Sequence, residues 1–172
     1  PGHEGVGEVI ESRYDGLQAG DKVLTVPGAG FQRCFADYQT LPGHWCLKRP
    51  DYDGPVEDLL MAQQFGTTIY ALRRGNFDFT GKTVAVLGQG SAGQLCAGQA
   101  KHLGAENVVV TDLSPARLGQ SDVFGADIAV AGDADGRAVR EAVMDSTDGR
   151  GAHIVIEAVG RSETIRHAID IA

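Results

Sequence analysis

Three glycines at a fixed spacing are the residues of this sequence that most specifically indicate chemistry. Gly88, Gly90 and Gly93 lie in the stretch LGQGSAGQL, directly after an apolar run. A strand that ends in Gly-x-Gly-x-x-Gly and leads into a helix is typical of pyrophosphate binding. The first glycine permits the tight turn, the second lets the phosphate approach the backbone, and the third lets helix and strand pack closely. Free N–H groups at the helix start, from Ser91 and Ala92 onward, would face the anion.

An acid at the expected distance supports this interpretation. The stretch NVVVTD ends in Asp112, 22 residues after Gly90, and the acid that binds the ribose of a dinucleotide stands about 20 residues on. Its carboxylate would accept hydrogen bonds from a ribose diol and repel a 2′-phosphate. Asp112 could instead cap a helix, but Ser114 and Pro115 supply a better cap and first turn. The sequence therefore predicts dinucleotide binding, with NAD preferred over NADP.

A histidine and a glutamate between glycines open the chain, in PGHEGVG. Taken alone, His3 and Glu4 are either a loose polar terminus or half of a metal site, because imidazole nitrogen and carboxylate oxygen both bind zinc. Gln63 also stands out, because a polar side chain on an apolar helical stripe needs partners. That stripe consists of Val56, Leu60, Gln63, Thr67 and Ala71.

The predicted secondary structure that would position these residues changes near residue 54, from short strands to alternating strands and helices. Before it, short runs broken by turns predict strands: GEVIES (7–12), DKVLTV (21–26) and FADYQTL (35–41). From residue 82, the apolar runs TVAVLG, NVVVTD, DIAVAG and HIVIEAVG alternate with helical stretches of ten or more residues. Continuous apolar runs indicate strands buried on both faces, so the class is α/β with a parallel sheet covered by helices.

Three parts follow from this pattern: residues 1–54, a connecting helix over 55–75, and a nucleotide-binding part over 76–172. The helix has a proline and acids at its start and a basic close. These residues are Pro55, Glu57, Asp58, Arg73 and Arg74.

Composition limits the class of partner. The net charge of −8 argues against nucleic acid or an anionic membrane surface as a partner. No apolar run approaches the length needed to span a membrane. Three cysteines, an odd number at scattered spacing, make no disulfide framework, so a cytoplasmic protein is expected.

In order and spacing, the motifs resemble those of the medium-chain dehydrogenase/reductase superfamily, and within it the zinc-dependent alcohol and polyol dehydrogenases. PGHEGVGEV resembles the Gly-His-Glu-x-x-Gly signature, AGDKV the Gly-Asp-x-Val strand and FADY the Phe-Ala-Glu-Tyr strand. VAVLGQGSAG resembles the nucleotide turn, and IEAVG the strand end beside the nicotinamide. The resemblance implies part of a GroES-like β-rich catalytic domain followed by a Rossmann doubly wound parallel sheet, with both ends of the family's chain absent.

The resemblance also implies a metal site. His3 matches a ligand of the catalytic zinc, and Glu4 the neighbour that binds or orients the metal. Gln63 matches a position where the family carries a Cys or Glu ligand, and its neutral amide oxygen is a poorer ligand for zinc. A structural zinc is not expected, because it needs four closely spaced cysteines and only Cys34 and Cys46 lie in that region.

Further positions match residues around the cofactor. Thr67 matches one that packs beside the nicotinamide ring, and Arg117 a basic residue near the adenosine ribose. Val159 and Arg161 match positions near the cofactor at the end of the fourth strand. For the two arginines, a solvated helix face is the alternative.

The function implied is an NAD-dependent oxidoreductase of alcohols or polyols, with one catalytic zinc that polarises the substrate oxygen. Its partners would be a small alcohol or carbonyl substrate and, in a homodimer or homotetramer, copies of itself. Two alternatives stay open: a zinc-free reductase of quinones or activated alkenes, and a nucleotide-binding protein without catalysis.

Overall fold

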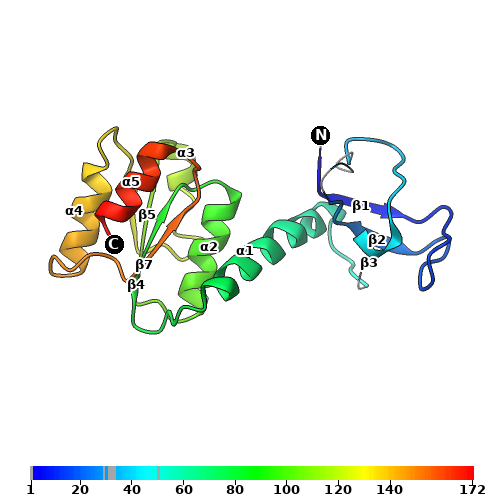
Figure 1. Ribbon diagram of the computed structural model, residues 1–172, viewed down its shortest axis with the longest axis horizontal. Helices are drawn as coiled ribbons and strands as arrows, with labels where there is room; N and C mark the ends of the chain where they lie inside the picture. The colour runs from blue at the N-terminus through cyan, green and yellow to red at the C-terminus, as the bar shows by residue number, and fades with distance from the viewer. Residues whose placement is uncertain (1, 29, 31–33, 50) are drawn as a thin grey trace. The chain divides into compact units, whose positions relative to one another are not determined.

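The computed structural model describes residues 2–28, 30, 34–49 and 51–172, and the chain divides into two compact units (Figure 1). We call Pro1–Gly66 the N-terminal unit and Thr67–Ala172 the C-terminal unit. The boundary falls inside helix α1 (Met61–Gly75), which follows a 3₁₀ helix, η2 (Val56–Leu60). The domain limits expected from the sequence stay a prediction.

The N-terminal unit contains a small antiparallel sheet. Its strands are β1 (Gly5–Glu8), β2 (Lys22–Thr25) and β3 (Cys46–Lys48), in the order β1-β2-β3. Strands were expected over 7–12 and 21–26, and β1 and β2 overlap those ranges.

The strand expected over 35–41 is wrong. Residues 35–37 form a bend, and the side chains of Phe35 and Tyr38 are 83% and 78% exposed, so neither face of this segment is covered. The third strand of the sheet is β3 instead, three residues that follow a short 3₁₀ helix, η1 (Gly43–Trp45).

The signals for the ends of the connecting helix are confirmed, but the stripe is not. Glu57 and Asp58 lie in the first turn of η2, and Arg73 and Arg74 in the last turn of α1. The buried residues of α1 are Thr68 and Leu72, each one position after the expected Thr67 and Ala71, which are exposed. The prediction therefore placed Thr67 and Ala71 on the wrong side of the helix. It assumed one helical period over the whole segment, whereas the chain changes from 3₁₀ to α geometry at Met61.

The C-terminal unit is built on the predicted parallel sheet, in the order β6-β5-β4-β7. Its strands are β4 (Thr83–Leu87), β5 (Asn107–Asp112), β6 (Ile128–Ala131) and β7 (Ile154–Glu157). The chain runs from β4 outward to β6 and then crosses to β7 on the other side of β4. The strand order therefore reverses between β4 and β7, and open α/β sheets bind ligands beyond the strand ends at such a point.

Helices cover both faces of this sheet (Figure 1). On one face, Val84, Val86 and Val108 pack with Ala97 and Ala100 of α2 (Ser91–His102). On the other face, the alternate strand residues pack against α4 (Arg137–Ser146) and the chain end after α5 (Ser162–Asp170). Cys96 in α2 is 6% exposed and belongs to the buried core. Among the described residues, no helix combines the length and apolar character needed to cross a membrane.

One connecting helix is shorter than expected. Helix α3 (Pro115–Leu118) has 4 residues, although ten or more were expected between each pair of strands. After it the backbone continues in turns, with Ser121 N–H donating to Leu118 O and Phe124 N–H to Ser121 O, both three residues back. The polar, glycine-containing stretch GQSDVFG supports turns better than a helix.

Candidate functional site

The glycine turn lies where β4 ends and α2 begins. Gly88 has φ +94°, a left-handed conformation that favours glycine. Its N–H donates to Thr111 O on the neighbouring strand, at 2.8 Å. A Cβ at Gly88 would come within 2.8 Å of Val159 Cγ2 and 3.1 Å of Ala158 O. The turn is therefore held between the ends of β5 and β7.

The second glycine borders open space, and the third is tightly packed. A Cβ at Gly90 would meet no protein atom within 4 Å, whereas a Cβ at Gly93 would overlap the carbonyl oxygen of Gly88. Gln94 N–H donates to Gly90 O at 3.0 Å, so the N–H groups of Ser91, Ala92 and Gly93 precede the first α-helical bond. This open helix start, with room over Gly90 and close packing at Gly93, is a cradle that fits a pyrophosphate.

Asp112, at the end of β5, is tied to the turn. Its Oδ2 accepts the N–H of Gln89 at 2.7 Å, its Oδ1 accepts the N–H of Ser114 at 2.8 Å, and Arg117 Nη1 lies 3.6 Å from Oδ2. Burial acts to raise the pKa of Asp112, but the two backbone hydrogen bonds and the Arg117 charge outweigh it, so the pKa lies below its ordinary value. The carboxylate is therefore ionised at neutral pH and acts only as an acceptor.

A buried amide links the turn to the segment after α3, and the sequence did not single it out. Gln89 is fully buried, its Nε2 donates to Gly88 O at 2.9 Å, and its Oε1 accepts the Ser121 hydroxyl at 3.2 Å. Ser121 is also fully buried, and its hydroxyl lies 3.3 Å from Arg117 O. The sequence offers a weak signal for this residue, because a glutamine that directly follows an apolar strand needs hydrogen-bond partners if it is buried.

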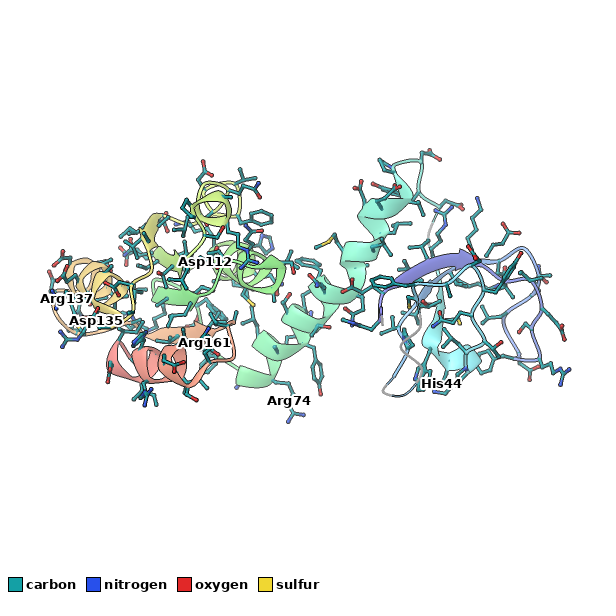
Figure 2. The ribbon with its side chains drawn as sticks, turned by 90° about the horizontal axis from the view of Figure 1, so that it is seen from above. His44, Arg74, Asp112, Asp135, Arg137 and Arg161 are labelled. Atoms are coloured by element: carbon teal, nitrogen blue, oxygen red, sulfur yellow. The ribbon has the colours of Figure 1, made fainter. Side chains whose placement is uncertain are left out.

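The remaining expected cofactor residues lie in different places. Val159 is 44% exposed and borders Gly88. Arg161 precedes α5 and pairs with Glu163 at 3.5 Å, and both side chains are largely exposed. Figure 2 shows Asp112 and Arg161, which come from different segments of the C-terminal unit. Thr67 lies on the exposed side of α1.

The expected metal residues belong to the N-terminal unit. His3 Nε2 lies 3.7 Å from Glu4 Oε1, and that oxygen is buried without a hydrogen-bond partner. Gln63 lines a pocket of about 70 Å³ together with Gly5, the residue after Glu4, and Thr25. Within the described residues, no three His, Cys, Asp or Glu side chains are grouped to hold a metal. A buried carboxylate oxygen without a hydrogen-bond partner fits a cation, and imidazole nitrogen and carboxylate oxygen are both donor types that bind zinc.

The chain is similar to known oxidoreductases. A family model described as zinc-binding dehydrogenase matches residues 92–172. The probable D-xylulose reductase A of Emericella nidulans is 29% identical over 200 residues, which cover 99% of this chain and 55% of that protein. The sorbitol dehydrogenase of Bacillus subtilis is 27% identical over 194 residues, which cover 98% and 54%. The chain thus spans about half the length of these curated relatives.

Similar solved structures share the fold. An alcohol dehydrogenase from Thermotoga maritima has 27% identity and a TM-score of 0.78, over 98% of this chain and 58% of that one. The mycobacterial protein Rv1454c, in complex with NADPH, has 26% identity and a TM-score of 0.83, over 99% and 52%. A quinone oxidoreductase of Pseudomonas syringae has 26% identity and a TM-score of 0.82, over 99% and 52%.

Proposed function

Because the chain belongs to the medium-chain dehydrogenase/reductase superfamily, we propose that it carries the nucleotide site and part of the metal site of an NAD-dependent dehydrogenase of alcohols or polyols. The observation that carries this proposal is the turn after β4. There an open helix start, a glycine with free space above it and an ionised aspartate at the next strand end lie together. These are the groups that a dinucleotide needs for its pyrophosphate and its ribose.

The chain's own residues would divide the work of binding. The N–H groups at the start of α2 would hold the pyrophosphate, and Asp112 would accept the adenosine ribose hydroxyls. His3 and Glu4 would hold a zinc ion, with a weak contribution from Gln63. They would act together with a further strong donor, since no three His, Cys, Asp or Glu side chains are grouped for a metal among the described residues. When bound, zinc polarises the alcohol oxygen and lowers its pKa, and NAD accepts the hydride that leaves the carbon.

The first alternative is a zinc-free reductase of quinones or activated alkenes. Two observations favour it: Gln63 stands where a charged ligand is expected, and a similar structure is that of a quinone oxidoreductase. A non-catalytic nucleotide-binding protein is the second. Metal analysis and an activity panel on the full-length protein separate the three candidates. Only the proposed dehydrogenase needs zinc and oxidises alcohols. The non-catalytic protein binds NADH but converts neither alcohols nor quinones and activated alkenes.

We expect Asp112 to set the cofactor preference. The unmodified protein should bind NADH at least about tenfold more tightly than NADPH, a difference of about 1.4 kcal/mol. Asp112→Ser should narrow this gap, because it removes the charge that repels a 2′-phosphate and releases Arg117 from its ion pair. Fluorescence titration with both cofactors measures the ratio, and equal affinities in the unmodified protein would defeat the assignment.

Substitutions of Gln63 test its place at the metal. Gln63→Glu should tighten zinc binding, since a charged oxygen is a better ligand than a neutral amide oxygen. Gln63→Ala should cost little metal for the same reason. Competition with a chromogenic chelator on the full-length protein gives both zinc affinities. If the glutamate and alanine variants hold zinc equally, position 63 lies outside the metal site.

A further inference from the structure

A single carboxylate at the end of β7 organises the segment that follows it. Oε1 of Glu157 accepts three hydrogen bonds, from the N–H of Val159 at 2.9 Å, the N–H of Gly160 at 3.0 Å and the hydroxyl of Thr164 at 2.7 Å. Oε2 accepts the N–H of Gly160 at 3.1 Å. The carboxylate thus fixes the loop over residues 158–160 and ties it to the first turn of α5.

This loop forms one wall of the glycine turn. Ala158 N–H donates to Leu87 O at 2.8 Å, which extends the pairing of β7 with β4 by one residue. Val159 Cγ2 and Ala158 O are the atoms that a Cβ on Gly88 would meet first. The conformation that Glu157 imposes therefore decides where the side chain of Val159 stands beside the turn.

The strand order indicates which part of a dinucleotide this wall would contact. Asp112 ends β5, on one side of β4, and β7 lies on the other side. With the adenosine ribose at Asp112 and the pyrophosphate at the start of α2, the second half of the molecule must extend over the end of β7. That half carries the nicotinamide.

We propose that Glu157 is a positioning residue for the nicotinamide half of the cofactor, an inference that rests on the proposed dinucleotide function. It acts through the backbone, by holding Val159 against the glycine turn. Hydrogen bonds to a charged acceptor are stronger than neutral ones, so three donors on one carboxylate oxygen make this loop rigid before the cofactor arrives. Without the carboxylate, the cofactor has to order the loop when it binds.

The experiment compares NADH with ADP-ribose, which lacks the nicotinamide, in the full-length protein. Glu157→Ala should weaken NADH binding about tenfold and leave ADP-ribose binding within about twofold. Glu157→Gln should recover most of the NADH affinity, because an amide oxygen in the place of Oε1 still accepts its three hydrogen bonds. Calorimetric titration with each ligand gives the two dissociation constants.

Two control variants separate this effect from others. Asp112→Ser should weaken NADH and ADP-ribose equally, because both contain the adenosine ribose. Glu141→Ala removes the same charge from an exposed position on α4 and should change neither. If Glu157→Ala does not fold, Thr164→Val removes one of the three donors without touching β7, and it should cause a smaller loss of about threefold for NADH alone.

Each outcome is decisive for one of the two proposals. An unmodified protein that binds neither NADH nor ADP-ribose would refute the dinucleotide function itself. The positioning role alone would be overturned if the unmodified protein binds both ligands and Glu157→Ala weakens the binding of NADH and ADP-ribose equally, or weakens neither. If Thr164→Val stands in, the same outcomes apply to it.

Discussion

Gly90→Val is expected to weaken NADH binding at least about 100-fold, or about 2.7 kcal/mol, while the C-terminal unit stays folded. A Cβ at this position meets no protein atom within 4 Å, and the backbone, at φ −68° and ψ 180°, suits a branched residue. In the protein without cofactor, a side chain at this position therefore starts in open space. The proposed pyrophosphate would clash with it, because the branched side chain would fill the space over the N-terminus of α2.

Gly93→Ala provides the contrast, because it should damage the fold instead. Its Cβ would overlap the carbonyl oxygen of Gly88, and that backbone oxygen cannot give way without moving the turn. Thermal unfolding of the cofactor-free protein and NADH titration should therefore separate the two variants. Gly90→Val should keep the unmodified melting temperature and lose affinity, whereas Gly93→Ala should melt earlier. A Gly90→Val protein that binds NADH normally would place the phosphate site elsewhere.

The C-terminal unit was predictable because its signals are local and strong. In runs such as TVAVLG, apolar residues follow one another instead of alternating with polar ones, which is typical of a strand buried on both faces, and all five residues of β4 are buried. The glycine spacing predicted the turn, because each glycine has its own steric reason: a left-handed backbone at Gly88, open space at Gly90 and close packing at Gly93. The length of α3 was misjudged, because the polar, glycine-containing stretch after it was counted as helix although it supports turns better.

The N-terminal unit was harder for the opposite reason. The segment FADYQTL was expected to be a strand because it is a short run between turns. A strand also needs a neighbour for its backbone hydrogen bonds, and a short run of residues cannot report one. Strand β3 has only three residues, too few for a pattern, and it exists because β2 pairs with it.

The role of Glu157 shows a further limit of sequence reasoning. The sequence shows an acid at the end of an apolar run, but it does not show which groups hydrogen-bond to that acid. Its partners Val159, Gly160 and Thr164 are close in the chain, but only the backbone path at the end of β7 turns two of their N–H groups and one hydroxyl toward the same oxygen. Residues that act through the backbone therefore need the structure to be found.

His3→Ala is expected to abolish zinc binding and, with it, alcohol oxidation in the full-length protein. Loss of a group that merely orients a zinc ligand costs about 10- to 100-fold in metal affinity, so loss of the ligand itself should cost more than about 100-fold. The structure supports this expectation beside the sequence motif. Oε1 of the neighbouring Glu4 is buried without a hydrogen-bond partner and lies 3.7 Å from His3 Nε2. An imidazole and an unsatisfied carboxylate oxygen at this separation suit a cation between them.

The control for this loss is His44→Ala, which removes an exposed histidine from the same unit (Figure 2). It should keep both metal and activity, which separates loss of a ligand from loss of any imidazole. NADH binding should survive in His3→Ala, because the groups proposed to hold the cofactor belong to the C-terminal unit and none of them is altered. Elemental analysis of the purified proteins, read beside their alcohol oxidation rates, decides the outcome. An unmodified enzyme that is active with no bound metal would move this protein to the zinc-free reductases, and the Gly-His-Glu segment would then be a structural turn.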